Sequence, residues 1–567
     1  MDTVKEGAVL TGGSSAGSSS DDDSMRRRWR LILCSAATEY SAGAILAMGA
    51  WQAELRDVLG LTTGQTMSIG AAIFFGTFFA FLGGRAFDAL GPRRTVLLGG
   101  GMACLGYLTL FTAVRFSDRL SSRAKLTLAT AGSVLAGYAC GNLLDLSASM
   151  ACSLSFPHER AAVVGYMKAV LATSAGLWAL LWVNVFAVVS SLASYLACAA
   201  ATVLTLSCLT ASGIVVLPEG EDYRRPFDHA DTVKLVFAVV SALAVAICTV
   251  AASSLRSAGL MGPTPAFGYA ALAIAAAPAC IIFLPSTKQR VSLRTTILVA
   301  EAATKLRRRT SFLSSRHSVY EVLSRGEAAP SSEYAGIPFC VAVRGSEFWL
   351  IWFVAFAILG AGNASNQNLA FVLESAADPD DTGLAVGLFA LTSTVVRVAV
   401  GIVSDKCQHI LSRVSMIPIV SASALVSQCL LALPNISSIM LGVFFSALSF
   451  GGFLTLFLPV LNEMYGRREF GVICGVQFVC QAVASFCISL ELMPGLYQAA
   501  ATRHGTITCV GPDCYQAYSG LASFLVVALL NLVGLGASLC LAWRIRAHKL
   551  PAERIAMRRH VEKLGYD

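Results

Sequence analysis

Apolar runs of about 20 residues recur along the whole chain, and they restrict the fold more than any other feature. As a helix, each run is long enough to cross the roughly 30 Å hydrocarbon core of a lipid bilayer. The pattern predicts an all-α membrane protein with about 14 transmembrane helices. Only 13% of the residues are charged, against about a quarter in soluble chains. The net charge of +8 therefore does not indicate nucleic acid binding, and the lipid bilayer is the expected environment.

The runs are grouped as six, then two, then six, which predicts two helical bundles with additional helices between them. A start rich in Ser, Gly and Asp predicts a disordered tail. The expected parts are a tail over 1–28, a bundle over 29–217, two additional helices over 218–285, a cytoplasmic loop over 286–346, a bundle over 347–545 and a cytoplasmic tail over 546–567.

Basic loops such as "GPRRT", "YGRREF" and "WRIRAHK" fall on one side of the predicted membrane, and the acidic "ESAADPDD" falls on the other. The positive-inside rule then predicts that both termini are cytoplasmic, although the basic loop "RFSDRLSSRAK" disagrees. We recognise no targeting signal in the sequence, so the plasma membrane is the default location.

Most of the 17 cysteines lie inside apolar runs, and no CxxC pair is present, so neither a metal nor a cofactor is expected. Cys509 and Cys514 differ because they share a polar loop, "TCVGPDCY", predicted to face outward. A disulfide is chemically allowed there, and two free thiols are the alternative.

A short motif occurs twice, at the end of the second helix of each predicted bundle. Gly84 precedes Asp88 by four residues, and Gly401 precedes Asp405 by the same spacing. The glycine allows close helix packing, and the carboxylate can pair with the arginines of the following loop. Internal repeats of this kind are typical of secondary transporters, which bind substrate between the two halves.

The stretch "GGRAFDALGPRR" resembles the loop motif of the major facilitator superfamily, with Gly84, Asp88, Gly91, Arg93 and Arg94 in the matching positions. The resemblance implies two six-helix bundles that work by alternating access, here with two additional helices. It covers essentially all of residues 31–544.

A finer resemblance lies in "RAAVVGYMKAVLATSAG", which is similar to the nodulin-like branch of that superfamily. The matching residues are Arg160, Val163, Val164, Gly165, Lys168 and Ser174, while Ala172 stands where the branch has glycine. The "CVGPDC" loop also resembles the paired-cysteine loop of this branch.

Four ionisable residues lie at a similar depth inside apolar runs: Glu39, Asp145, Lys168 and Arg397. At a rise of about 1.5 Å per residue, each lies roughly 10–13 Å from the cytoplasmic end of its helix. The facilitator resemblance implies that all four can face a central cavity. The alternative is that Asp145 and Lys168 neutralise each other as a structural pair, with Arg397 bonded to backbone carbonyls.

An arginine matches a carboxylate with two parallel hydrogen bonds, so we expect Arg397 to bind an anionic substrate and Lys168 to raise the local positive potential. The stretch "TSTVVRVAVGIVSD" resembles the arginine-bearing helix of the monocarboxylate transporters. It departs from them at Ser393, where they have aspartate, and at Glu39 and Tyr40, where their first helix has lysine. Glu39 or Asp145 is then expected to carry a proton.

The stretch "GNASNQNLAF" places Asn363 and Gln367 on one helix face. These amides, with Tyr40, are candidate substrate ligands; hydrogen bonding between helices is the alternative for the amides.

The sequence as a whole predicts a monomeric, proton-coupled carrier of small organic anions such as pyruvate or lactate. Two alternatives stay open: a carrier of amino acids, other metabolites or metal chelates, and a non-transporting membrane sensor that uses the 286–346 loop. No nucleophile–base or metal constellation points to an enzyme.

Overall fold

Every element in the part of the chain that the computed structural model describes is helical, with no strand among them. The described residues are 16–218, 226–283, 337–373, 382–493 and 523–563, apart from scattered positions within these ranges, and isolated positions between 495 and 502. In this part, eleven helices are long and apolar enough to cross a membrane, and the shorter Pro265–Ile281 is also apolar. The predicted all-α membrane class is confirmed.

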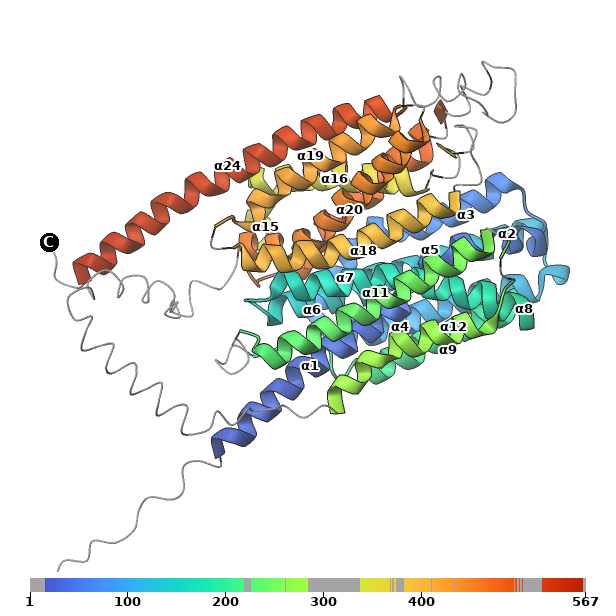
Figure 1. Ribbon diagram of the computed structural model, residues 1–567, viewed down its shortest axis with the longest axis horizontal. Helices are drawn as coiled ribbons and strands as arrows, with labels where there is room; N and C mark the ends of the chain where they lie inside the picture. Colours follow the sequence, from blue (N-terminus) through green and yellow to red (C-terminus); the bar gives the residue numbers. More distant parts are fainter. Residues whose placement is uncertain are drawn as a thin grey trace, which may run out of the picture.

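The N-terminal bundle contains several helices that continue through a short 3-10 or π-helical segment (Figure 1). Its elements are α1 (Ala16–Ala42), η1 (Gly43–Ala47), α2 (Met48–Leu59), α3 (Thr63–Phe75), η2 (Gly76–Phe79), α4 (Ala80–Arg115), η3 (Ser117–Arg119), α5 (Ser122–Tyr138), η4 (Ala139–Asp145), α6 (Leu146–Ser155), α7 (Arg160–Leu181), η5 (Trp182–Phe186), α8 (Ala187–Val189) and α9 (Leu192–Thr210).

The continuous range of α4 joins the end of one apolar segment to the start of the next. Gly91 separates them with φ 77° and ψ 164°, a backbone conformation that residues with a side chain rarely adopt. Pro92 follows directly and starts the next helical segment, where its missing N–H is not needed. Gly91 therefore acts as the turn between two helices.

The C-terminal bundle forms a second group of helices beside the first (Figure 1). Its elements are α15 (Phe339–Ala342), α16 (Ser346–Gln367), α18 (Thr382–Lys406), α19 (Arg413–Leu431), α20 (Ile436–Tyr465), α21 (Phe470–Ala484), η8 (Ser485–Leu492) and α24 (Phe524–Lys563). The bundles meet where α4 packs against α21 and α7 packs against α18.

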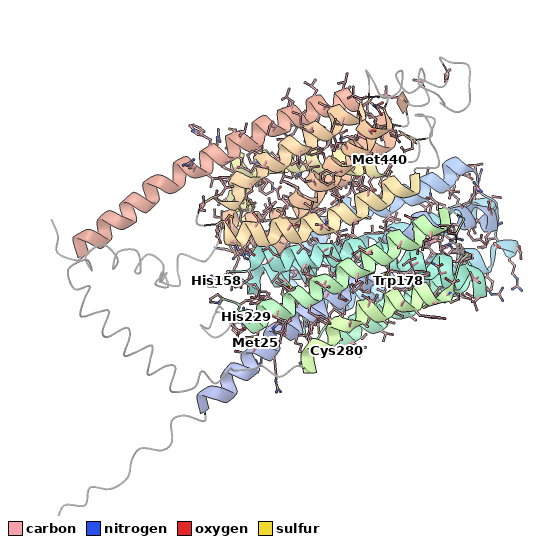
Figure 2. The ribbon with its side chains drawn as sticks, viewed as in Figure 1. Met25, His158, Trp178, His229, Cys280 and Met440 are labelled. Carbon is pink, nitrogen blue, oxygen red and sulfur yellow. The ribbon has the colours of Figure 1, made fainter. Side chains whose placement is uncertain are left out.

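The additional helices are α11 (His229–Ser257) and α12 (Pro265–Ala276), followed by η6 (Ala277–Phe283). Helix α11 packs against both α7 and α18, so it contacts both bundles, while α12 packs against α11 and α7. The start of α11 is fixed to the N-terminal bundle because the indole N–H of Trp29 donates to Asp231 Oδ1 at 2.7 Å. Figure 2 shows His158 and His229 near the same end of the molecule.

The start of α1 and the end of α24 also lie toward that end (Figure 1). The terminal residues themselves lie outside the described residues, and the prediction that both termini share one side of the membrane stays a prediction. The cytoplasmic assignment of that side and the domain boundaries stay predictions.

Candidate functional site

The two repeated aspartates make the same contact in opposite directions between the bundles. Asp88, at the end of one α4 segment, accepts from the backbone N–H groups of Gly471 and Val472, both at 2.9 Å. Asp405, near the end of α18, accepts from Ala161 at 3.1 Å and Ala162 at 2.7 Å. Each carboxylate thus binds the first turn of a helix in the other bundle, where N–H groups lack partners within the helix.

The repeated glycines allow this contact because they bring backbones together. A Cβ added to Gly84 would lie 1.8 Å from the carbonyl oxygen of Gly471, and one added to Gly401 would lie 2.4 Å from that of Ala161. The repeated motif of glycine and aspartate therefore marks two places where the backbones of the two bundles are in close contact at this end.

The predicted pairing of the first aspartate with loop arginines is wrong. Among the described residues, no ion pair joins Asp88 to Arg93 or Arg94, and its two oxygens are used by backbone N–H groups instead. The second aspartate does pair with an arginine, since Arg413 Nη2 lies 2.6 Å from Asp405 Oδ1.

Further bonds between the bundles close the same end. Arg467 of the C-terminal half donates to the carbonyl of Leu154 at 2.5 Å, and Asn462 donates to that of Ser153 at 3.0 Å. Arg160 lies 3.9 Å from Glu463, which also contacts Arg413. These contacts and those of Asp88 and Asp405 hold the two bundles together at the end that contains the repeated motif, and together they form the latch.

The charged residues that the sequence places at one depth are joined in the structure. The ammonium of Lys168 contacts Asp145 Oδ1, and Lys168 is only 2% exposed. The hydroxyl of Ser149 lies 3.0 Å from Glu39 Oε1 and 3.3 Å from Asp145 Oδ1. Glu39, Ser149, Asp145 and Lys168 therefore form a continuous polar chain inside the N-terminal bundle.

The chemistry of Ser149 limits the protonation of this chain. A serine hydroxyl has one hydrogen, so it can donate to only one of the two carboxylate oxygens beside it. The other contact is favourable only when that carboxyl group is itself protonated. Glu39 is fully buried and its Oε2 has no hydrogen-bond partner in the described structure. The arrangement is suited to holding a proton between Glu39 and Asp145.

Arg397 reaches this chain from the other bundle. Its guanidinium donates to the backbone carbonyl of Lys168 and lies 5.8 Å from the centre of the Phe450 ring. It is 5% exposed, and its Nε has no partner within the described residues. The position matches the alternative in which Arg397 bonds a carbonyl. Glu39, Asp145, Lys168 and Arg397 therefore form one buried group of two carboxylates and two cations.

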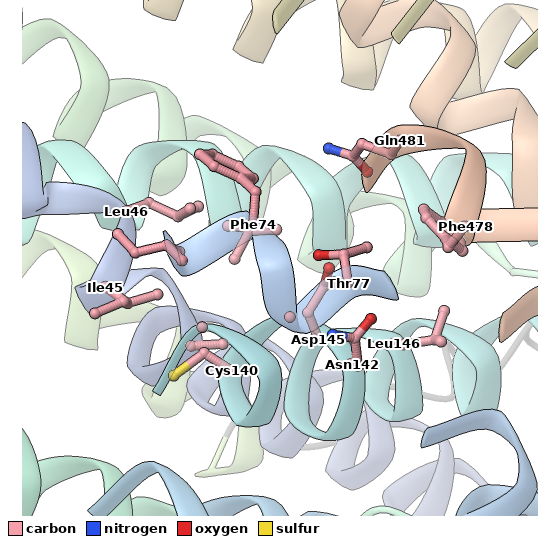
Figure 3. A pocket seen from close by; sticks show the side chains of 15 residues that line it. Ile45, Leu46, Phe74, Thr77, Cys140, Asn142, Asp145, Leu146, Phe478 and Gln481 are labelled. Atoms are coloured by element: carbon pink, nitrogen blue, oxygen red, sulfur yellow. The ribbon is translucent and has the colours of Figure 1, made fainter. Parts of the chain in front are cut away.

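A pocket of about 120 Å³ lies beside this polar chain of side chains, between the N-terminal bundle and α21. Its polar lining consists of Thr77, Asn142, Asp145 and Gln481. Figure 3 shows Thr77, Asn142 and Asp145 near one another, with the apolar Ile45 and Leu46 at the other side. Asp145 is the only charged residue in this lining, which does not include Glu39, Lys168 or Arg397.

Sequence reasoning missed three of these polar residues. Asn142 lies three positions before Asp145, a spacing that would share one face in a regular α-helix, so a polar pair could be seen in the sequence although the segment is π-helical. Thr77 and Gln481 come from elements distant in the sequence, and no local pattern distinguishes them from other polar residues in apolar helices.

The remaining predicted ligands lie elsewhere. The Tyr40 carbonyl accepts from Ser174 at 2.7 Å and from the Trp178 indole at 2.9 Å. Asn363 donates to Ser485 Oγ at 2.9 Å, which joins α16 to η8. Gln367 ends α16, and its side chain lies outside the described residues, as do Cys509 and Cys514.

These features define a class: a polytopic α-helical membrane protein of two latched bundles with a buried polar site between them. No family model matches the chain, and no curated protein matches its sequence. Among the described residues, no group of His, Cys, Asp and Glu is suited to hold a metal ion.

Two solved structures resemble the fold. One is the major facilitator superfamily proton:xylose symporter XylE bound to 6-bromo-6-deoxy-D-glucose, with 14% identity, a TM-score of 0.49, and coverage of 88% of this chain and 94% of that one. The other is the human organic anion transporter MFSD10 (TETRAN), with 14% identity, a TM-score of 0.48, and coverage of 91% and 99%.

Proposed function

We propose that the protein is a secondary active transporter of small monocarboxylates, such as pyruvate or lactate, and that it carries a proton with the anion. The observation that supports this most is the buried Lys168–Asp145 pair, which borders the pocket and continues through Ser149 to Glu39. A cation, an exchangeable carboxylate and a proton store are the parts that such a cycle needs.

The cycle begins with the pair. A substrate carboxylate entering the pocket competes with Asp145 for the Lys168 ammonium. Asp145 then becomes an unpaired buried charge, which is unfavourable unless it takes up a proton. Asp145 lines the pocket and takes that proton from the solution that brings the anion, and Ser149 touches both carboxyl groups, so Glu39 and Asp145 together gain one proton. Anion and proton therefore bind together because each removes the penalty of the other.

Arg397 couples this step to the bundles. It lies on α18 and donates to a carbonyl of α7, so it links the two bundles at the level of the charged chain. When the bundles separate, the guanidinium loses that carbonyl and becomes available to a carboxylate. Release of the contacts of Asp88 and Asp405 opens the latched end.

A second candidate is carriage of a small amino acid. It is favoured by one observation: the charged group that lines the pocket is a carboxylate, Asp145, which suits an ammonium group.

Uptake of labelled pyruvate into proteoliposomes, with and without an inward proton gradient, tests the proposal. We expect gradient-stimulated uptake that unlabelled lactate inhibits and alanine does not. Inhibition by alanine supports the amino acid alternative, and no uptake of any small anion contradicts the proposed function.

A further inference from the structure

Asn142 is an exception among the buried asparagines of the described chain. It is 3% exposed, and its buried Nδ2 has no hydrogen-bond partner among the described residues. The other buried asparagines all donate through Nδ2: Asn184, Asn363, Asn462 and Asn531. A buried amide without partners is unfavourable, and groups of this kind require an explanation such as a ligand.

The surroundings of Asn142 identify what that ligand offers. The residue lies on η4, a π-helical segment, together with Asp145, and both line the pocket. π-Helical turns within α-helices are frequent at functional sites. The amide donates through Nδ2 and accepts through Oδ1, the Asp145 carboxylate can accept, and Thr77 can do either. A hydroxyl group, which both donates and accepts, complements this set.

The size of the pocket limits the rest of the ligand. A protein cavity of roughly 150 Å³ can hold benzene, so the pocket of about 120 Å³ suits a ligand of about six non-hydrogen atoms or fewer. Its apolar side, with Ile45 and Leu46, accepts a methyl group. Lys168 contacts Asp145 and lies 6.0 Å from the centre of the Phe478 ring, and Phe478 also lines the pocket. The ligand's carboxylate therefore has a cation within reach.

We infer that Asn142, with Asp145 and Thr77, forms a subsite for the hydroxyl group of a small 2-hydroxy acid. The inference rests on the proposed function and deepens it, because it separates 2-hydroxy acids from acids of similar size that lack the hydroxyl group. A site built to hydrogen-bond a hydroxyl discriminates strongly against the analogue without it, because the polar groups of the site are left unpaired.

The test compares labelled lactate and labelled propionate in proteoliposomes under one inward proton gradient. We expect kcat/KM for lactate to exceed that for propionate by about tenfold or more, as is usual when a buried polar group is left without its hydrogen bond. Asn142→Leu is expected to bring this ratio close to one. Asn142→Ser, which retains a smaller polar group, is the second variant if the leucine variant does not fold. Asn531→Leu is the matched control, since Asn531 is equally buried and lies on α24, away from the pocket lining.

The outcomes separate the two proposals. A lactate preference that falls in the Asn142 variants and persists in the Asn531 variant supports the subsite. Equal transport of both acids by the unmodified protein, or a preference that the Asn142 variants retain, overturns the subsite and leaves the proposed function standing. Uptake of neither acid overturns both.

Discussion

Lys168 and Asp145 form a buried ion pair between consecutive helices of one bundle, and only the carboxylate of the two lines the pocket. Under the proposed function, the pair is a contact that opens when substrate binds and not a fixed structural one. This proposal sets one condition for substrate binding: the Lys168 ammonium becomes available only when the Asp145 carboxylate is neutralised. The first prediction follows from this condition.

Exchanging the two charges by Lys168→Asp with Asp145→Lys separates structure from function. Each single change places two like charges together in a buried site and is expected to lower stability by on the order of 3 kcal/mol or more. The double variant is expected to regain most of the thermal stability in detergent and to remain inactive in uptake, since the carboxylate now occupies the place of the ammonium. Restored uptake in the double variant would mean that the pair is only structural.

The close contacts of Gly84 and Gly401 give a second prediction. A methyl group at either position collides with a backbone carbonyl of the other bundle, so Gly84→Ala and Gly401→Ala are expected to weaken the latch. Cys474 is buried on α21, next to the Gly84 contact, and its modification by maleimide, followed by mass spectrometry, should accelerate several-fold in Gly84→Ala.

Gly101→Ala is the control for this experiment, because an added Cβ there meets nothing within 4 Å. Equal labelling of Cys474 in the Gly84 and Gly101 variants would contradict the latch.

The sequence predicted much of this frame for physical reasons. A repeated glycine and aspartate at the same spacing, at equivalent helix ends, can be recognised without coordinates. Depth along a helix is also a matter of counting residues, which is why Glu39, Asp145, Lys168 and Arg397 could be grouped. The structure connects all four, through Ser149 and the Lys168 carbonyl.

Counting residues does not predict the direction in which a side chain points once a helix departs from 3.6 residues per turn. Asp145 and Asn142 lie on π-helical η4, and Ser485 begins π-helical η8. Such segments rotate the following residues, and apolar runs do not reveal them. The partners of Asp88 were mispredicted for a related reason, since backbone N–H groups at a helix start leave no signal in side-chain chemistry.

The Asn363–Ser485 bond gives a third prediction. Because the amide is bonded to a neighbouring helix, we interpret Asn363 as a packing contact and not as a substrate ligand. A double-mutant cycle with Asn363→Ala and Ser485→Ala should give a coupling free energy of about 1 kcal/mol, typical of hydrogen bonds between membrane helices. The KM for pyruvate should change less than about threefold. A large rise in KM without loss of stability would restore Asn363 to the binding site.

The fourth prediction concerns the attachment of α11. The Trp29–Asp231 hydrogen bond is buried and involves a carboxylate, so Asp231→Ala is expected to cost about 1.5–3 kcal/mol of stability. Thermal unfolding in detergent measures this loss. Asp57→Ala is the control, because Asp57 forms an exposed pair with Arg56 and should contribute little. Equal effects of the two substitutions would show that the Trp29 contact does not fix the helix.

The most direct test measures proton and anion movement in the same proteoliposomes, with an internal pH indicator and labelled pyruvate. The account predicts that about one proton enters with each anion, and that Lys168→Met and Glu39→Gln abolish the coupled movement. Pyruvate uptake without proton entry, or coupled uptake that survives Lys168→Met, would contradict the exchange of Asp145 for the substrate carboxylate.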